Sequence, residues 1–175
     1  MRNLAFIAAT GILAFPWPTF AQDKDMTASE LVAAEKTCNK LTSKKKATPE
    51  RLEACYDTGR EYGLRGSKAV ERDGTKSALY LARACDNGLG KACSLISWYY
   101  LDNSAYESSS EKSRAYDTKG CALGEATGCA GVGYWYAEEG DIEAAKKHYR
   151  KAIELKPDYE YAQKKLAELE AKDSL

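Results

Sequence analysis

Six cysteines are the residues of this sequence whose type and spacing suit covalent or metal chemistry, and they stand at positions 38, 55, 85, 93, 121 and 129. Zinc sites are usually built from close pairs of Cys or His, such as Cys-x-x-Cys. The sequence contains no Cys-x-x-Cys, and His148 is its only histidine. An even number of cysteines in an exported chain is typical of disulfides. We therefore expect three disulfides, no metal site and no cysteine nucleophile, because a paired sulfur has no thiolate form.

A second pattern that could do chemistry is Ser-x-x-Lys, which carries the nucleophile in serine β-lactamases. It occurs at Ser43/Lys46 and at Ser109/Lys112. The companion motifs Ser-Asp-Asn and Lys-Thr-Gly are absent, and both matches fall in segments rich in serine or lysine. Because chance matches are common in such segments, we predict no catalytic residue. His148 stands among Lys and Arg residues, so we expect it at the solvated surface.

The first 21 residues have the pattern of a secretory signal peptide. A positive charge at Arg2 precedes an apolar run at residues 4–15, and Thr19-Phe20-Ala21 fits a cleavage site. The run is shorter than the ~20 residues that a spanning helix needs. We expect cleavage near Ala21 and a periplasmic or secreted mature chain, residues 22–175. No later stretch is long and apolar enough for stable membrane insertion.

The mature chain is nearly neutral, since removal of Arg2 leaves one fewer basic than acidic side chain. Proteins that bind nucleic acid usually carry a clear basic excess. The charge balance therefore argues against nucleic acid as a partner. A chain of this length is expected to form one domain with a core of its own.

A repeat of 36 residues organises the middle of the chain. The segment from Cys85 to Cys93 recurs from Cys121 to Cys129, and flanking tyrosines keep the same spacing. A third copy is centred on Cys55, because each of these cysteines has a small residue four positions later and a tyrosine seven positions later: Gly59/Tyr62, Ser97/Tyr100 and Gly133/Tyr136. A period between 20 and 50 residues is typical of a solenoid.

The local patterns are helical almost throughout, with no alternating run that predicts a strand. We expect helices after Thr27, after Thr48-Pro49 and after Ser108–Glu111, and at about 75–86, 91–101, 126–139, 142–155 and 159–171. Thr27 with Glu30 forms a capping-box pattern, and Gly88 is a helix stop. The predicted fold class is an all-α, α/α solenoid of antiparallel helix pairs. Its repeats are expected at about 49–88, 89–124 and 125–158, followed by a cap helix at 159–172.

The repeat alignment also predicts how the cysteines pair. Cys55, Cys93 and Cys129 are equivalent, and a second cysteine stands near the end of each preceding helix. The predicted disulfides are Cys38–Cys55, Cys85–Cys93 and Cys121–Cys129. Each would join the end of one helical hairpin to the start of the next, and closing such short loops stabilises a fold by about 2.5–3 kcal/mol apiece.

The residues of these repeats resemble a known family. Residues 63–73, followed by Ser77, Leu81, Ala84, Cys85 and Gly88, resemble the Sel1-like repeat. The last unit resembles a tetratricopeptide repeat through Gly133, Tyr136, Gly140, Ala145, Tyr149, Ala152 and Pro157. The cysteine spacing is similar to that of the secreted, cysteine-rich branch of Sel1-like proteins, some of which are described as penicillin-binding proteins or weak β-lactamases.

The resemblance implies a partner-binding groove lined by the first helix of each pair. Transferred to this sequence, the groove positions are Glu53, Tyr56, Arg60, Lys91, Ser94, Trp98, Thr127 and Tyr134. The tyrosines at 62, 100 and 136 are expected in the core. For Trp98 and Tyr134 both a groove and a core position remain open.

We therefore expect a repeat protein that binds another protein and needs no cofactor. The role would be that of an adaptor, or of an immunity or inhibitor protein that neutralises a periplasmic toxin or effector; an envelope protein is another partner of this kind. The alternative, which comes from the cysteine-rich branch, is penicillin binding or weak β-lactamase activity.

Overall fold

The computed structural model describes residues 26–41, 47–63, 67–101 and 106–173. Regular structure in these ranges is entirely helical, and the helices are α1 (Ala28–Cys38), α2 (Pro49–Gly63), α3 (Gly74–Asp86), α4 (Gly90–Leu101), α5 (Ser110–Ala122), α6 (Ala126–Glu138), α7 (Ile142–Leu155) and α8 (Glu160–Asp173). The predicted signal peptide lies outside the described residues. No helix of the described part is long and apolar enough to cross a membrane.

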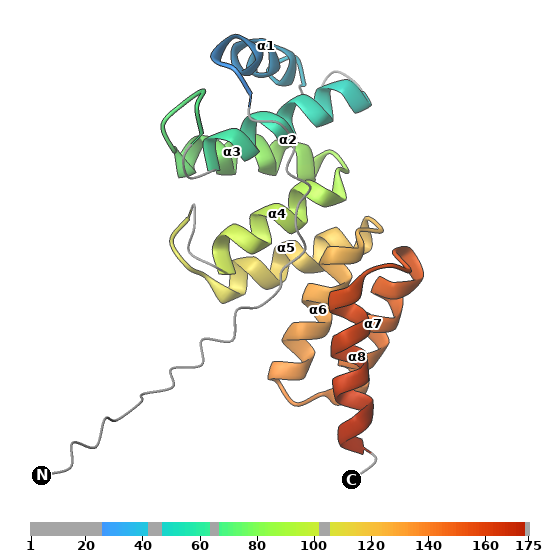
Figure 1. Ribbon diagram of the computed structural model, residues 1–175. Coiled ribbons are helices and arrows are strands. Elements are labelled where there is room, and N and C mark those ends of the chain that lie inside the picture. The colour runs from blue at the N-terminus through green and yellow to red at the C-terminus, as the bar shows by residue number, and fades with distance from the viewer. Residues whose placement is uncertain (1–25, 42–46, 64–66, 102–105, 174–175) are drawn as a thin grey trace, which may run out of the picture.

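The helices follow one another along an elongated stack, from α1 at one end to α7 and α8 at the other (Figure 1). The tightest pairs are α2 with α3, α4 with α5, and α6 with α7, and each pair also packs on the next. The first helices of neighbouring pairs touch as well, α2 with α4 and α4 with α6. This arrangement confirms the predicted α-solenoid, in which each unit contacts its neighbours.

Polar side chains fix the starts of several helices. The Thr27 hydroxyl accepts a hydrogen bond from the Glu30 backbone N–H at 3.3 Å, and the Glu30 carboxylate accepts one from the Thr27 N–H at 2.7 Å. The predicted capping box is therefore present. Asp73, Ser109 and Asp141 accept from the backbone N–H three residues later at the starts of α3, α5 and α7. Each bond satisfies a donor that the helix itself leaves open.

Small residues let the two helices of a hairpin approach closely. At Gly59 a Cβ atom would lie 2.6 Å from Leu81 Cγ and 3.0 Å from the Ser77 carbonyl oxygen on α3. At the equivalent place in the next pair, the hydroxyls of Ser97 and Ser113 are 2.9 Å apart. The small residue four positions after each repeat cysteine thus faces the second helix of its own hairpin.

The three disulfides join Cys38 to Cys55, Cys85 to Cys93, and Cys121 to Cys129, as predicted. All six sulfurs are therefore paired. The bridges connect α1 to α2, α3 to α4 and α5 to α6, which are the joints between successive hairpins. They lie within or beside two groups of buried apolar residues, one spanning α1 to α4 and one spanning the end of α5 to α8.

The tyrosines that follow each repeat cysteine by seven positions form stacked ring pairs. Tyr62 stacks on Tyr80 with centroids 6.1 Å apart, and Tyr100 stacks on Tyr116 at the same distance. Tyr62 is buried, as predicted, whereas Tyr100 and Tyr136 are only partly buried and close the edge of the core. Ring stacking and partial burial together position the end of each first helix.

Candidate partner-binding groove

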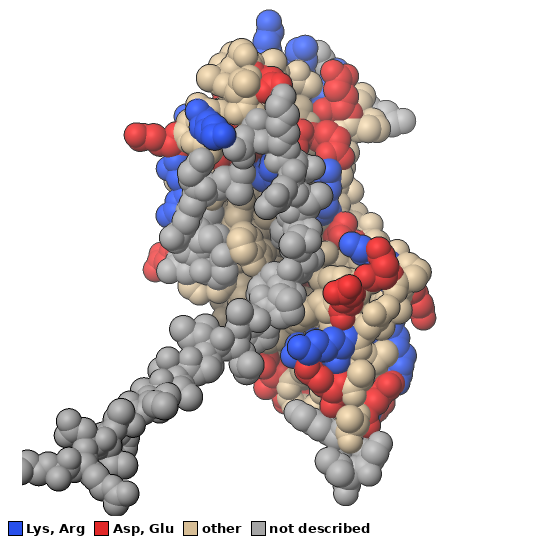
Figure 2. Space-filling view, in the orientation of Figure 1, with Lys and Arg blue, Asp and Glu red and all other residues tan. Residues whose placement is uncertain are grey.

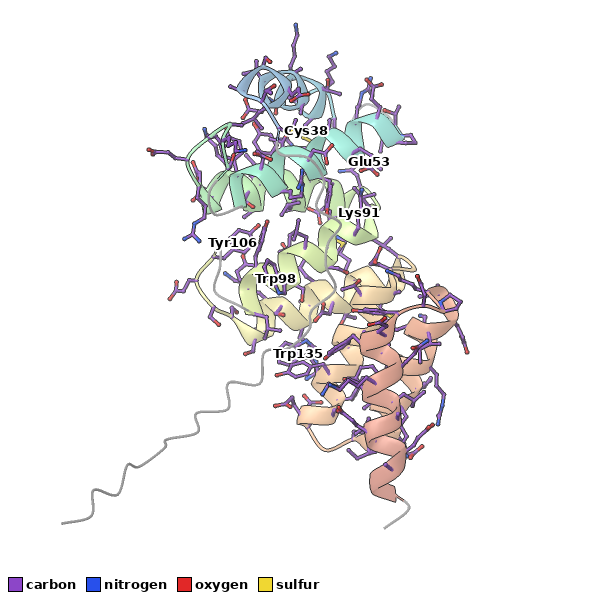
Figure 3. All side chains as sticks on the ribbon, viewed as in Figure 1. Cys38, Glu53, Lys91, Trp98, Tyr106 and Trp135 are labelled. Atoms are coloured by element: carbon purple, nitrogen blue, oxygen red, sulfur yellow. A yellow bond between two sulfur atoms is a disulfide. The ribbon has the colours of Figure 1, made fainter. Side chains whose placement is uncertain are left out.

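The predicted groove residues on α2 and α4 meet in one cluster. The Lys91 ammonium lies 2.5 Å from a Glu53 carboxylate oxygen and 4.3 Å from the centre of the Tyr56 ring. Figure 3 shows Glu53 and Lys91 side by side where the two first helices approach each other. The Lys91 and Glu53 side chains are 38% and 45% exposed, and their ion pair lies against the buried ring of Tyr56.

Three predicted groove residues are buried instead of lining an open surface. Tyr56 is 3% exposed, Arg60 8% and Ser94 2%. Neighbouring helices cover them: Lys91 of α4 lies over Tyr56, and the Tyr99 hydroxyl of α4 donates to the Arg60 carbonyl at 3.5 Å. Their burial differs from the expected groove exposure. The repeat motif gives the position of a residue along its helix, but its exposure depends on how the neighbouring helices pack against it.

Trp98, Thr127 and Tyr134 remain partly exposed along α4 and α6. The Trp98 ring packs on Tyr99 with centroids 5.4 Å apart, and Tyr134 packs on Trp135 at 5.0 Å. Each aromatic side chain therefore rests on a neighbouring ring and keeps part of its surface open. The sequence left open whether Trp98 and Tyr134 lie in the groove or in the core. In the structure both side chains contact a neighbouring ring and keep an accessible face.

A pocket of about 220 Å³ lies between α6, α7 and α8, next to the predicted groove position Tyr134. Its lining residues are Tyr134, Ala137, Glu138, Ile142, Tyr149, Lys165, Glu168 and Leu169. Burial raises the pKa of the Tyr134 hydroxyl, and the Glu138 carboxylate adds to that effect. Burial raises the pKa of Tyr149 in the same way. Both phenols therefore stay neutral, and the pocket combines aromatic walls with carboxylates.

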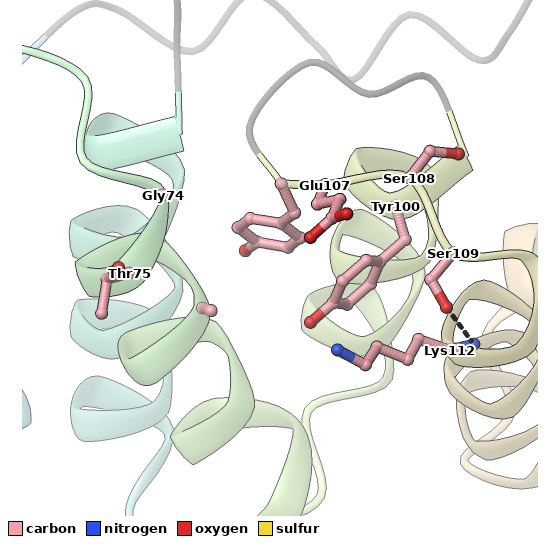
Figure 4. Close-up of a pocket in the computed structure, with 9 residues that line it drawn as sticks. Gly74, Thr75, Tyr100, Glu107, Ser108, Ser109 and Lys112 are labelled. Carbon is pink, nitrogen blue, oxygen red and sulfur yellow. Dashed lines mark hydrogen bonds between the residues drawn. The ribbon is translucent and has the colours of Figure 1, made fainter.

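A larger and more open pocket, of about 590 Å³, lies between the start of α3 and the start of α5. It contains the second Ser-x-x-Lys match. The Ser109 hydroxyl accepts the Lys112 backbone N–H at 3.3 Å, and the Lys112 ammonium lies 5.2 Å from the Tyr100 ring centre (Figure 4). Ser109 therefore serves as a helix cap, and Lys112 extends away from it. The first match, Ser43/Lys46, lies outside the described residues.

His148 differs from its expected place at the solvated surface. It is half-buried and stacks on Tyr136, with ring centroids 5.4 Å apart. Burial lowers the pKa of His148, and the positive charges of Lys151 and Lys147 lower it further. His148 follows Lys112 by 36 residues, one repeat period, and Lys112 lies over Tyr100, the equivalent of Tyr136. The repeat spacing is therefore the sequence signal that pairs His148 with Tyr136.

Asp117 is a buried polar residue that the sequence reading did not single out. It is 5% exposed, and the Trp135 indole N–H donates to its carboxylate at 2.9 Å. Burial raises the pKa of Asp117 to about 7, against the opposing effect of hydrogen bonds from Ser97 and Trp135. The sequence signal for Asp117 is a charged residue at the repeat position where the preceding unit has the apolar Leu81, 36 residues earlier.

The described residues hold no group of three His, Cys, Asp or Glu arranged to bind a metal ion. On the face that Figure 2 shows, basic and acidic side chains are interspersed and neither sign dominates. Among the predicted groove residues, the partly exposed side chains are Trp98, Thr127, Tyr134 and the Glu53–Lys91 ion pair.

Residues 126–159, which comprise α6, α7 and the turn after them, match the family model described as tetratricopeptide repeat. A comparison with curated proteins found no match. Among solved structures, the chain is similar to a Sel1 repeat protein from Oxalobacter formigenes, with a TM-score of 0.61 and 19% sequence identity. That alignment covers 79% of this chain and 98% of the other. The chain is thus a helical repeat protein with the Sel1-like and tetratricopeptide fold.

Proposed function

We propose that this chain binds another protein through a groove formed by its first helices, α2, α4 and α6. The observation that carries this proposal is the pair of partly exposed aromatics, Trp98 and Tyr134, each supported by a neighbouring ring. Tyrosine and tryptophan are enriched among the residues that dominate binding energy at protein interfaces. A solenoid also presents an extended surface that suits a protein partner better than a small molecule.

The disulfides support the same proposal by stiffening the joints between hairpins. A surface that is already ordered loses less conformational entropy when it binds. A constrained groove of this kind suits stable, specific capture of one partner. Its role would be that of an adaptor or of an immunity or inhibitor protein that acts on a toxin, effector or envelope protein.

The location we infer is the periplasm or the medium, after cleavage near Ala21. Three disulfides are compatible with an oxidising compartment. The intact mass of the exported protein checks this inference, because it should correspond to a chain that starts at Gln22. A full-length chain retained in the cytoplasm would contradict it.

The test of the binding function starts with a pull-down from envelope extract, followed by mass spectrometry and direct affinity measurement with the partner found. We expect Trp98→Ala and Tyr134→Ala each to weaken binding at least about tenfold, because buried interface aromatics are frequent hot spots. Leu79→Ala is the control, since Leu79 is exposed on α3, a second helix.

Circular dichroism and thermal melting separate lost binding from lost folding in these variants. Unchanged affinity in both aromatic variants would rule out the groove as the binding surface. Turnover of nitrocefin by the mature protein, lost on Ser43→Ala or Ser109→Ala, would instead favour β-lactam hydrolysis.

A further inference from the structure

We propose that the pocket between α6 and α8 receives a lysine or arginine side chain of the bound partner. The inference rests on the proposed function, because it assigns a chemical preference to one part of the same groove. The pocket adjoins Tyr134, which is one of the two aromatics that carry that function.

The size and walls of the pocket suit a single long side chain. Its volume of about 220 Å³ is below the ~300–1,000 Å³ typical of small-molecule sites. Tyr134 of α6 and Tyr149 of α7 supply aromatic surface, and Leu169 of α8 supplies an aliphatic wall. The methylene stem of lysine or arginine packs on such surfaces, and its cation is attracted to the faces of tyrosine rings.

The charges around the pocket favour a cation over an anion. Glu138 and Glu168 both line it, against one ammonium, that of Lys165. Lys165 lies 2.9 Å from a Glu168 carboxylate oxygen, so this pair is neutralised internally. The exposed Glu138 carboxylate forms no ion pair within the described part of the chain, which leaves one negative charge at the pocket.

Glu53, which is the carboxylate among the predicted groove residues, differs from the pocket residue Glu138. Glu53 already pairs with Lys91 at 2.5 Å, so an incoming cation there would have to replace an existing partner. At Glu138 an incoming cation adds an ion pair without removing one. An acidic or phosphorylated side chain would face the unneutralised Glu138 and is therefore disfavoured at this position.

The test uses the ¹⁵N-labelled mature chain, residues 22–175, and three short capped peptides that differ at one central residue. The residues are arginine, citrulline, which is its neutral isostere, and glutamate. We expect the arginine peptide to shift the backbone resonances of Tyr134, Glu138 and Leu169 in a saturable way. The citrulline peptide should shift them at least about threefold less, and the glutamate peptide should not shift them.

Variants then locate the charge that is responsible. Glu138→Gln keeps the shape of the side chain and removes its charge, and it should weaken arginine-peptide binding about threefold, as expected for an exposed ion pair. Glu154→Gln is the matched control, because Glu154 is an exposed carboxylate of α7 outside the pocket. No shift with any peptide, equal shifts with arginine and citrulline, or no effect of Glu138→Gln would overturn the inference.

This failure is distinguishable from failure of the proposed function, because the peptide titration needs no identified partner. If Trp98→Ala and Tyr134→Ala weaken the affinity of the partner but Glu138→Gln does not, the groove remains the binding surface and the inferred cation preference is wrong. If the affinity of the partner is unchanged by both aromatic substitutions, the proposal that the groove binds the partner is wrong.

Discussion

Asp117 shows how one residue can depart from its repeat and still be accommodated. It lies where the preceding unit has Leu81, and Gly131 on α6 leaves the space for its carboxylate, because a Cβ atom there would lie 2.4 Å from Asp117 Oδ2. Trp135 supplies the hydrogen bond that a buried polar group needs. The sequence could not predict this arrangement, since the partners come from another helix and the repeat pattern suggests an apolar residue.

Stability should fall as the pH rises through the range between the two pKa values of Asp117. Its pKa is about 7 in the folded chain and near 3.8 in an unfolded one, so the folded state binds the proton more tightly. The stabilising contribution is complete below about pH 4 and is lost as the pH rises towards 7. At about 1.4 kcal/mol per pKa unit, the loss amounts to a few kcal/mol by pH 8.

Asp117→Asn should remove this pH dependence, because the amide keeps an oxygen to accept from Trp135 and carries no charge. Urea unfolding is expected to show a more stable variant at pH 8 and near-equal stability at pH 4.5. Asp86→Asn is the control, since Asp86 is exposed and pairs with Lys119 at the surface. Parallel pH curves for Asp117→Asn and the unsubstituted protein would contradict the assignment.

At the scale of the helices, the repeat pattern was sufficient for the element order and for most boundaries. The period fixes equivalent positions, and caps such as Thr27 and stops such as Gly88, whose φ is +104°, mark the ends. The repeat pattern was insufficient to predict which groove positions are exposed. Ser94, for example, carries a groove offset but packs against α5, where a Cβ atom added to Gly120 would lie 3.0 Å from the Ser94 hydroxyl. Exposure depends on contacts between helices, which a motif does not contain.

The close approach of α2 and α3 predicts a strict size limit at Gly59. Gly59→Ala should lower the free energy of unfolding by about 1–3 kcal/mol, because the new methyl group would lie 2.8 Å from the Leu81 backbone nitrogen as well as against its side chain. Gly133→Ala is the matched comparison and should cost less, because its nearest neighbours, the Tyr149 ring at 3.1 Å and the Ala145 carbonyl oxygen at 3.2 Å, leave more room for a methyl group. Equal losses of unfolding free energy for the two variants in chemical denaturation would show that the shorter distances at Gly59 do not set the limit.

At the scale of the whole molecule, three of the four joints between successive hairpins and caps carry a disulfide. The joint between α7 and α8 has none, because the last cysteine is Cys129. Stability in a solenoid is approximately a sum over units and their interfaces. Each joint therefore responds to its own cross-link, with little effect on distant ones.

Reduction of the protein should consequently loosen specific joints. With a reductant present, amide hydrogen exchange should become faster where α1 meets α2, where α3 meets α4 and where α5 meets α6. Exchange at the α7–α8 joint should stay the same, so this joint serves as an internal control. A uniform increase along the chain would mean that the disulfides stabilise the molecule as one cooperative unit.

The connectivity of the disulfides also bears on how the chain matures. Six cysteines allow 15 pairings, and this fold uses the one that joins the first to the second, the third to the fourth and the fifth to the sixth. The paired cysteines are 17, 8 and 8 residues apart, so no bridge requires a distant part of the polypeptide. In the export that we propose, each bridge can therefore close as soon as its own segment has left the channel, in order from the N-terminus. Oxidation that follows emergence gives the native pairing without later reshuffling.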